Sequence, residues 1–188
     1  MPTPPPEDLA LLRGLLRGSS GWWASARLRV LQDDGLLPPR AALLVLRRPL
    51  MGVPAGVRVE DADGAVLARG LGEEVDDAGL RPLLDPLALA TGLPPAVGAL
   101  PSRERRQTVE RLVLADVEGV VVEDRPCLRG VVSGLPAPSG TTAAQGLRVV
   151  LDTTSGLPLS VGPLAGPPVL ALRVEELDPR LEDDVLGG

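Results

Sequence analysis

Apolar and polar residues alternate along most of the chain, most regularly near its C-terminal end. Apolar side chains occupy every second position in residues 147–151 and again in residues 157–161. A period of two is typical of strands with one buried face. The turn-forming residues 153–156 separate the two stretches, and the alternation returns in residues 170–174. The pattern predicts a hairpin followed by one more strand.

The N-terminal region instead has an apolar stripe with the spacing of a helix. Leu9, Leu12 and Leu16 recur three or four positions apart, and Gly18 follows as a plausible stop. Such a stripe usually faces a protein core, although it can also face a partner. We therefore expect an amphipathic helix that packs against a sheet.

Further strands are expected in the first half of the chain. Residues 24–30 alternate, whereas residues 42–46 are continuously apolar, as in a strand buried on both faces. Residues 57–69 read as a hairpin, and Asp63-Gly64 suits a tight primed turn between its strands. We expect one or two short helical turns in residues 80–90, where prolines stand near the starts.

The second half contains the most strand-prone region, residues 108–122. Asp116 and Gly119 interrupt it and predict a turn or bulge. Residues 123–126 should turn the chain into another strand at residues 127–133. Together these elements predict the α+β class, with one large antiparallel sheet and helices on one face.

The composition limits the chemistry that the chain can perform. The sequence contains no Lys, His, Phe, Tyr, Ile or Asn, which is typical of a GC-rich bacterial genome. Without histidine there is no imidazole base, and without lysine there is no Schiff base. Cys127 is the single cysteine, so neither an internal disulfide nor a cysteine metal cluster can form. We expect a non-enzymatic protein with no catalytic residues, metal or cofactor.

Charge and targeting features narrow the possible partners. The net charge of −6 disfavours a nucleic-acid role, which usually requires a basic face. One basic cluster, Arg103, Arg105, Arg106 and Arg111, could clamp an anion or an acidic partner, or could simply be solvated. No signal peptide or membrane-spanning run is evident, so we expect a cytoplasmic protein whose residues 1–6 form a flexible leader.

Five short segments carry motifs spread over nearly the whole sequence: residues 58–67, 83–89, 123–129, 151–159 and 177–186. Together they resemble motifs of the outer-membrane lipoprotein carrier superfamily (LolA/RseB-like). The resemblance implies that residues 1–188 form a single LolA-like domain. Its fold would be a strongly curved antiparallel sheet, a half-barrel, with helices covering the concave face. Members of this superfamily hold lipid chains there or use the fold to dock proteins.

Two functions therefore remain open. The first is a non-catalytic binding domain with an apolar cavity for a lipid or other hydrophobic ligand. The alternative is a protein-interaction or scaffold domain whose cavity is filled. Trp22 and Trp23 could rim such a cavity or lie at the edge of a core. The candidate cavity residues are Leu12, Leu16, Trp22, Trp23, Leu28, Leu84 and Leu87.

Overall fold

The computed structural model divides the chain into two compact units. One contains residues 1–22 and 82–169, and the other contains residues 23–81 and 170–188. The residues that the structure describes are 5–17, 24–32, 40–47, 56–71, 103–134, 146–181 and 185–186. The expectation that residues 1–188 form a single domain stays a prediction.

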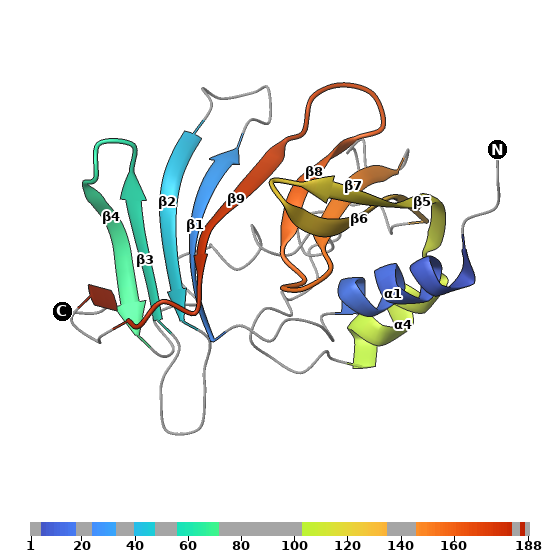
Figure 1. Ribbon diagram of the computed structural model, residues 1–188, viewed down its shortest axis with the longest axis horizontal. Coiled ribbons are helices and arrows are strands. Elements are labelled where there is room, and N and C mark those ends of the chain that lie inside the picture. Colours follow the sequence, from blue (N-terminus) through green and yellow to red (C-terminus); the bar gives the residue numbers. More distant parts are fainter. Residues whose placement is uncertain are drawn as a thin grey trace. The chain divides into compact units, whose positions relative to one another are not determined.

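The described residues of the first unit form two helices and a four-stranded antiparallel sheet (Figure 1). Its strand order is β8-β7-β6-β5, so each strand pairs with its neighbour in sequence. The elements are α1 (Pro6–Arg17), α4 (Arg103–Arg111), β5 (Val113–Val122), β6 (Arg125–Ser133), β7 (Leu147–Asp152) and β8 (Pro158–Pro163).

Helix α1 covers part of this sheet with its apolar stripe. It packs against α4, β5 and β6, and its buried residues are Leu12, Leu15 and Leu16. Gly130 of β6 makes room for this contact, because a Cβ atom there would stand 2.7 Å from Leu12 Cδ2. The predicted amphipathic helix is therefore confirmed, and its stripe faces a core.

Backbone conformation explains two irregular points of this unit. Asp116 has a φ of 52°, and the pairing register of β5 with β6 shifts between Ala115 and Glu118, which confirms the predicted bulge. Glu123 and Asp124 have φ values of 49° and 61°, and Val122 pairs directly with Arg125. Positive φ at both central residues is typical of a primed two-residue turn, which matches the twist of the flanking strands.

The second unit contains a five-stranded antiparallel sheet of order β4-β3-β2-β1-β9 (Figure 1). Its core comes from alternate residues of the strands, among them Leu28, Leu44, Val57 and Leu172. The strands are β1 (Ser25–Gln32), β2 (Arg40–Arg47), β3 (Gly56–Asp61), β4 (Val66–Leu71) and β9 (Leu170–Leu177). Strand β9, from the end of the chain, pairs with β1.

The turn between β3 and β4 differs from the predicted primed turn. Asp61 N donates to Ala65 O at 3.0 Å, which closes a three-residue loop. Of the residues in that loop, Gly64 alone has a positive φ, 84°. Asp61 Oδ1 accepts hydrogen bonds from the backbone N–H groups of Asp63 and Ala65, both at 2.9 Å. The carboxylate thereby organises the loop itself, and a three-residue connection with a left-handed glycine results.

The α+β class and the antiparallel sheet arrangement are confirmed. One element was missed, because residues 108–111, predicted to begin a strand, form the last turn of α4. The helical turns expected in residues 80–90 lie outside the described residues. Among the described residues, no helix is both long and apolar enough to cross a membrane.

Candidate functional site

The structure describes three of the seven candidate cavity residues. Leu12 and Leu16 lie together on one face of α1 in the first unit, whereas Leu28 belongs to β1 in the second unit. The other four candidates, Trp22, Trp23, Leu84 and Leu87, lie outside the described residues.

The three described candidates are completely packed. Leu12 and Leu28 have 0% of their surface accessible, and Leu16 has 1%. A side chain that borders a void large enough for water would retain some accessible surface, so these leucines touch protein atoms on all sides. Their role as ligand contacts stays a prediction.

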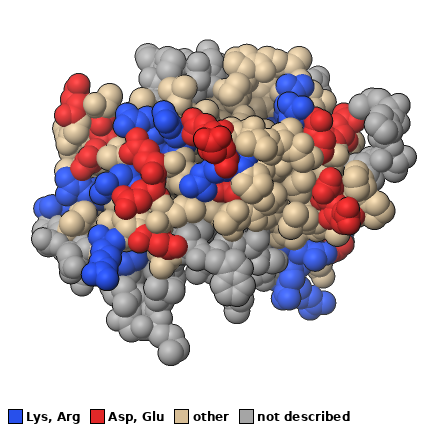
Figure 2. All heavy atoms as spheres, in the orientation of Figure 1, with Lys and Arg blue, Asp and Glu red and all other residues tan. Residues whose placement is uncertain are grey.

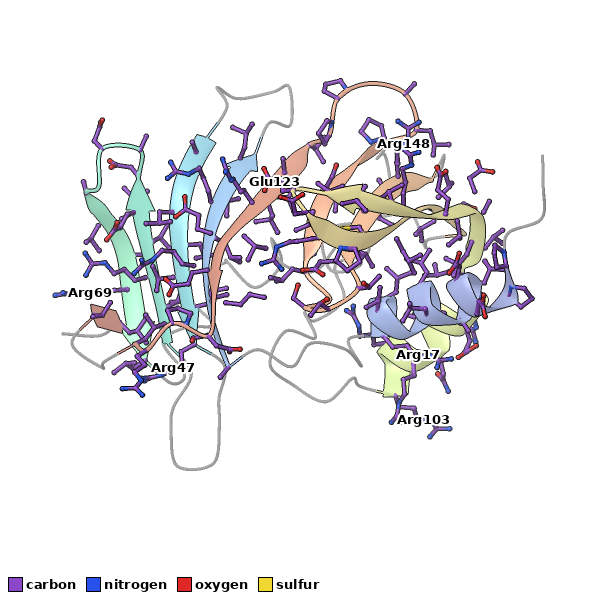
Figure 3. The ribbon with its side chains drawn as sticks, in the orientation of Figure 1. Arg17, Arg47, Arg69, Arg103, Glu123 and Arg148 are labelled. Carbon is purple, nitrogen blue, oxygen red and sulfur yellow. The ribbon has the colours of Figure 1, made fainter. Side chains whose placement is uncertain are left out.

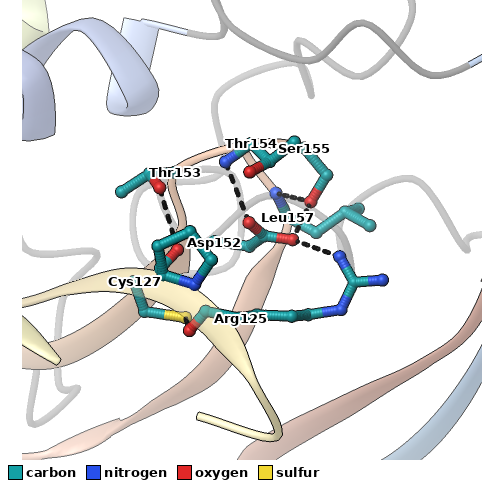
Figure 4. A network of polar contacts seen from close by, with 8 residues as sticks. Arg125, Cys127, Asp152, Thr153, Thr154, Ser155 and Leu157 are labelled. Atoms are coloured by element: carbon teal, nitrogen blue, oxygen red, sulfur yellow. Dashed lines mark hydrogen bonds and ion pairs between the residues drawn. The ribbon is translucent and has the colours of Figure 1, made fainter. Parts of the chain in front are cut away.

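The most developed polar cluster is centred on Asp152, at the end of β7 (Figure 4). Its side chain is completely buried, and Oδ2 accepts hydrogen bonds from Arg125 Nη1 at 2.8 Å and Ser155 Oγ at 2.7 Å. The other carboxylate oxygen, Oδ1, accepts from the backbone N–H of Thr154 at 2.9 Å. Three donors therefore satisfy a buried charge that would otherwise be costly.

Backbone contacts extend this cluster into the neighbouring hairpin. Asp152 N donates to Leu157 O at 2.9 Å, and Gly156 N donates to Asp152 O at 2.8 Å. Thr153 donates twice to Pro126 O, from its N–H at 2.9 Å and from Oγ1 at 2.8 Å. The cluster thus ties the β7–β8 turn to the start of β6. We interpret the cluster as structural, because both carboxylate oxygens of Asp152 already accept hydrogen bonds from within the protein.

Sequence reasoning identified this turn but not the network within it. The signal that was present is an Asp followed three positions later by a Ser, a spacing that favours side-chain bonds within a turn. The ion-pair partner, Arg125, is 27 positions away in sequence. Arg125 is brought close to Asp152 by the pairing register of β6 with β7, in which Cys127 lies opposite Asp152.

Cys127 lies beside this network and is buried. Burial is the main cause that raises the pKa of its thiol, and the negative charge of Asp152 raises the pKa further. A backbone hydrogen bond at Val122 and the charge of Arg125 oppose the increase in pKa without cancelling it. The thiol also donates to Arg125 O at 3.3 Å. This geometry favours the inert core thiol expected of a cysteine without a base partner.

We expect the Cys127 thiol of the native protein to react with iodoacetamide at least about tenfold more slowly at pH 8.5 than the thiol of the urea-unfolded chain, because the thiolate is the reactive species. As pH rises past the ordinary thiol pKa, the unfolded chain loses its proton first, so the free energy of unfolding should fall. Urea titrations at pH 7.5 and 9.5 measure this fall. In the Cys127→Ala variant, the free energy of unfolding should fall less between these two pH values. An equal fall in both proteins would contradict the raised pKa of the Cys127 thiol.

The predicted basic cluster separates into a buried and an exposed part. Arg105 is buried, and its Nη2 donates to Leu16 O at 2.7 Å, at the C-terminal end of α1. Arg13 reciprocates, because its Nη1 donates to Val109 O at 2.6 Å near the end of α4. Cations at these ends favour both helix dipoles. The remaining arginines of α4 are exposed, and Arg103 points away from the helix in Figure 3.

Among the described residues, no group of three or more histidine, cysteine, aspartate or glutamate side chains is placed to hold a metal ion. Several carboxylates pair with an arginine on the surface, for example Glu118 with Arg129 and Glu175 with Arg29. No family model matches the chain, and no curated protein matches it. The function of the protein must therefore be inferred from the geometry of its described residues.

Proposed function

We propose that the chain is a non-catalytic protein-interaction or scaffold domain, built on a half-barrel of the LolA-like type whose interior is filled. The observation that carries this proposal is the complete burial of Leu12 and Leu16 on the inner face of α1. A ligand could enter there only if the helix moved away from the sheet. In the first unit, binding is therefore better supported on outer surfaces than in an interior cavity.

Exposed apolar side chains on the outermost strands agree with this proposal. Leu67 of β4 is 62% exposed, and Val121 of β5 is 74% exposed. Strand β4 lies at one edge of the second unit's sheet, and β5 lies at one edge of the first unit's sheet. Apolar side chains at sheet edges are suitable contacts for a partner chain, and they are costly to leave in water.

We expect the purified protein to show, by native mass spectrometry, the mass of the 19.5 kDa chain without bound small molecules. Organic extraction of the same sample should release no stoichiometric lipid. Cross-linking in the native host, followed by mass spectrometry, should then identify a recurrent protein partner. A co-purifying hydrophobic ligand at one equivalent would contradict the proposal.

The second candidate is a binding domain for a lipid or another hydrophobic ligand. The resemblance of the motifs supports it, and so do the buried leucines of α1, since Leu12 and Leu16 would line a cavity if α1 moved away from the sheet. The extraction experiment separates the two candidates, because one equivalent of lipid supports the second and excludes the first.

A further inference from the structure

Helix α4 presents three arginines to solvent. Arg103, Arg106 and Arg111 are all exposed, and we call them the α4 arginine face. The opposite side of the helix is buried through Arg105 and Val109. Within the described part of the chain, none of the three exposed arginines forms an ion pair or a side-chain hydrogen bond. In Figure 2 basic side chains gather over this region, at the lower right.

Among the side chains of α4 that the structure describes, the acidic one, Glu110, does not neutralise these charges. Glu110 is shared by two arginines of α1, Arg13 and Arg17. Helices α1 and α4 together hold six arginines and four acidic residues, a net charge of +2. The rest of the chain has thirteen arginines and twenty-one acidic residues, a net charge of −8. The helix pair is therefore a positive region on an acidic protein, and charge selects an anionic partner for it.

The spacing along the helix indicates the shape of that partner. At a rise of about 1.5 Å per residue, Arg106 stands about 4.5 Å from Arg103 along the axis, and Arg111 about 7.5 Å further. At about 100° per residue, Arg111 also lies about 140° around the helix axis from Arg106. The three arginines therefore cover a broad face about 12 Å long, which is too large for a single phosphate group to bridge. Its length equals that of about four residues of extended chain, at about 3.3 Å each. Several carboxylates on one extended segment match this arrangement.

We propose that the α4 arginine face binds an extended acidic segment of a protein partner. Guanidinium groups pair with carboxylates through two parallel hydrogen bonds, so three arginines can hold an acidic peptide in one orientation. This inference rests on the proposed interaction function and names the partner's chemistry. It requires neither a cavity nor any movement of α1.

A fluorescein-labelled hexaglutamate peptide tests the inference by fluorescence anisotropy at low salt. The triple variant Arg103→Gln, Arg106→Gln, Arg111→Gln should bind about tenfold more weakly than wild type, since each exposed pair contributes modestly. The matched control Arg29→Gln, Arg69→Gln, Arg180→Gln removes the same charge from exposed positions of the second unit. It should bind as wild type does. Circular dichroism checks that both variants are folded.

An equal loss of peptide affinity in the two triple variants would overturn the inference, because the net charge of the protein, and not the position of the arginines on α4, would then control binding. The inference would also be overturned if the wild-type protein did not bind the peptide. It would be overturned as well if anionic vesicles or inorganic phosphate displaced the labelled peptide as effectively as unlabelled peptide does. The proposed function is judged separately by cross-linking in the host. A partner that cross-links equally to wild type and to the α4 triple variant preserves that function and overturns the inference.

Discussion

Replacing Asp152 with alanine should lower the free energy of unfolding by about 3 kcal/mol, because the change removes the buried acceptor that three donors share. Arg125 Nη1, Ser155 Oγ and the N–H of Thr154 would all lose their bond to this side chain. Arg125 remains partly exposed and can turn toward water, so the cost should stay below the upper range for buried ion pairs. Urea denaturation followed by far-ultraviolet circular dichroism measures the change.

Two further variants show whether the effect comes from the network. Asp63→Ala removes a carboxylate from an exposed turn and should change the free energy of unfolding by less than about 0.5 kcal/mol. The double variant Asp152→Ala, Arg125→Ala should be less destabilised than the two single effects combined, because each single change already breaks the ion pair. A cost below about 1 kcal/mol for Asp152→Ala, or strict additivity, would contradict the structural role of this network.

Local patterns were sufficient to predict most of the strands. The alternation in residues 24–30, 147–151 and 170–174 identified β1, β7 and β9, because a two-residue period leaves one face of a sheet to be buried. The apolar stripe identified α1 for the corresponding reason. These predictions succeeded because each element buries its own regular face, so the pattern needs no knowledge of the partner element.

Helix α4 was missed because its pattern is mostly polar. Its sequence, RERRQTVER, contains one strongly apolar residue, Val109, and no repeating stripe. Its position is fixed by contacts across the chain, since Arg105 binds Leu16 O and Arg13 binds Val109 O. An arginine in a sequence usually predicts a surface position. Its long side chain can nevertheless cover apolar surface and reach the end of a neighbouring helix. The exposed remainder of the cluster is the part that the sequence predicted as a possible acidic-partner site.

The conformations of the turns could be predicted only in part, because tertiary contacts also influence them. Asp63-Gly64 matched a primed turn by composition, whereas the primed geometry occurs at Glu123-Asp124, where neither residue is glycine. Left-handed conformations cost such residues on the order of 1 kcal/mol each. Here the pairing of β5 with β6 on both sides of the turn supplies the stabilisation. Tertiary pairing therefore overrides the local preference.

Replacing Leu12 with alanine should lower the free energy of unfolding by about 3 kcal/mol, the middle of the range for buried leucines. Leu12 is fully buried and stands against Gly130, which has no side chain to move into the vacated space. The neighbouring Leu11 is 43% exposed on the same helix, so Leu11→Ala is a matched control and should cost less than about 1 kcal/mol. Both changes alter helix propensity equally, and the difference between them isolates packing.

The same pair of variants discriminates between the two candidate functions. In a filled core, the space left by Leu12→Ala has no occupant, and the full cost of the cavity appears as lost stability. In a domain that holds a hydrophobic ligand, Leu12 would be a wall of the binding site, and a bulkier or shifted ligand could fill the space. Leu12→Ala would then cost little in the ligand-loaded protein, and the extracted ligand would change in amount or size. A large loss of stability with no extractable ligand supports the interaction domain, whereas a small loss accompanied by altered ligand would overturn it.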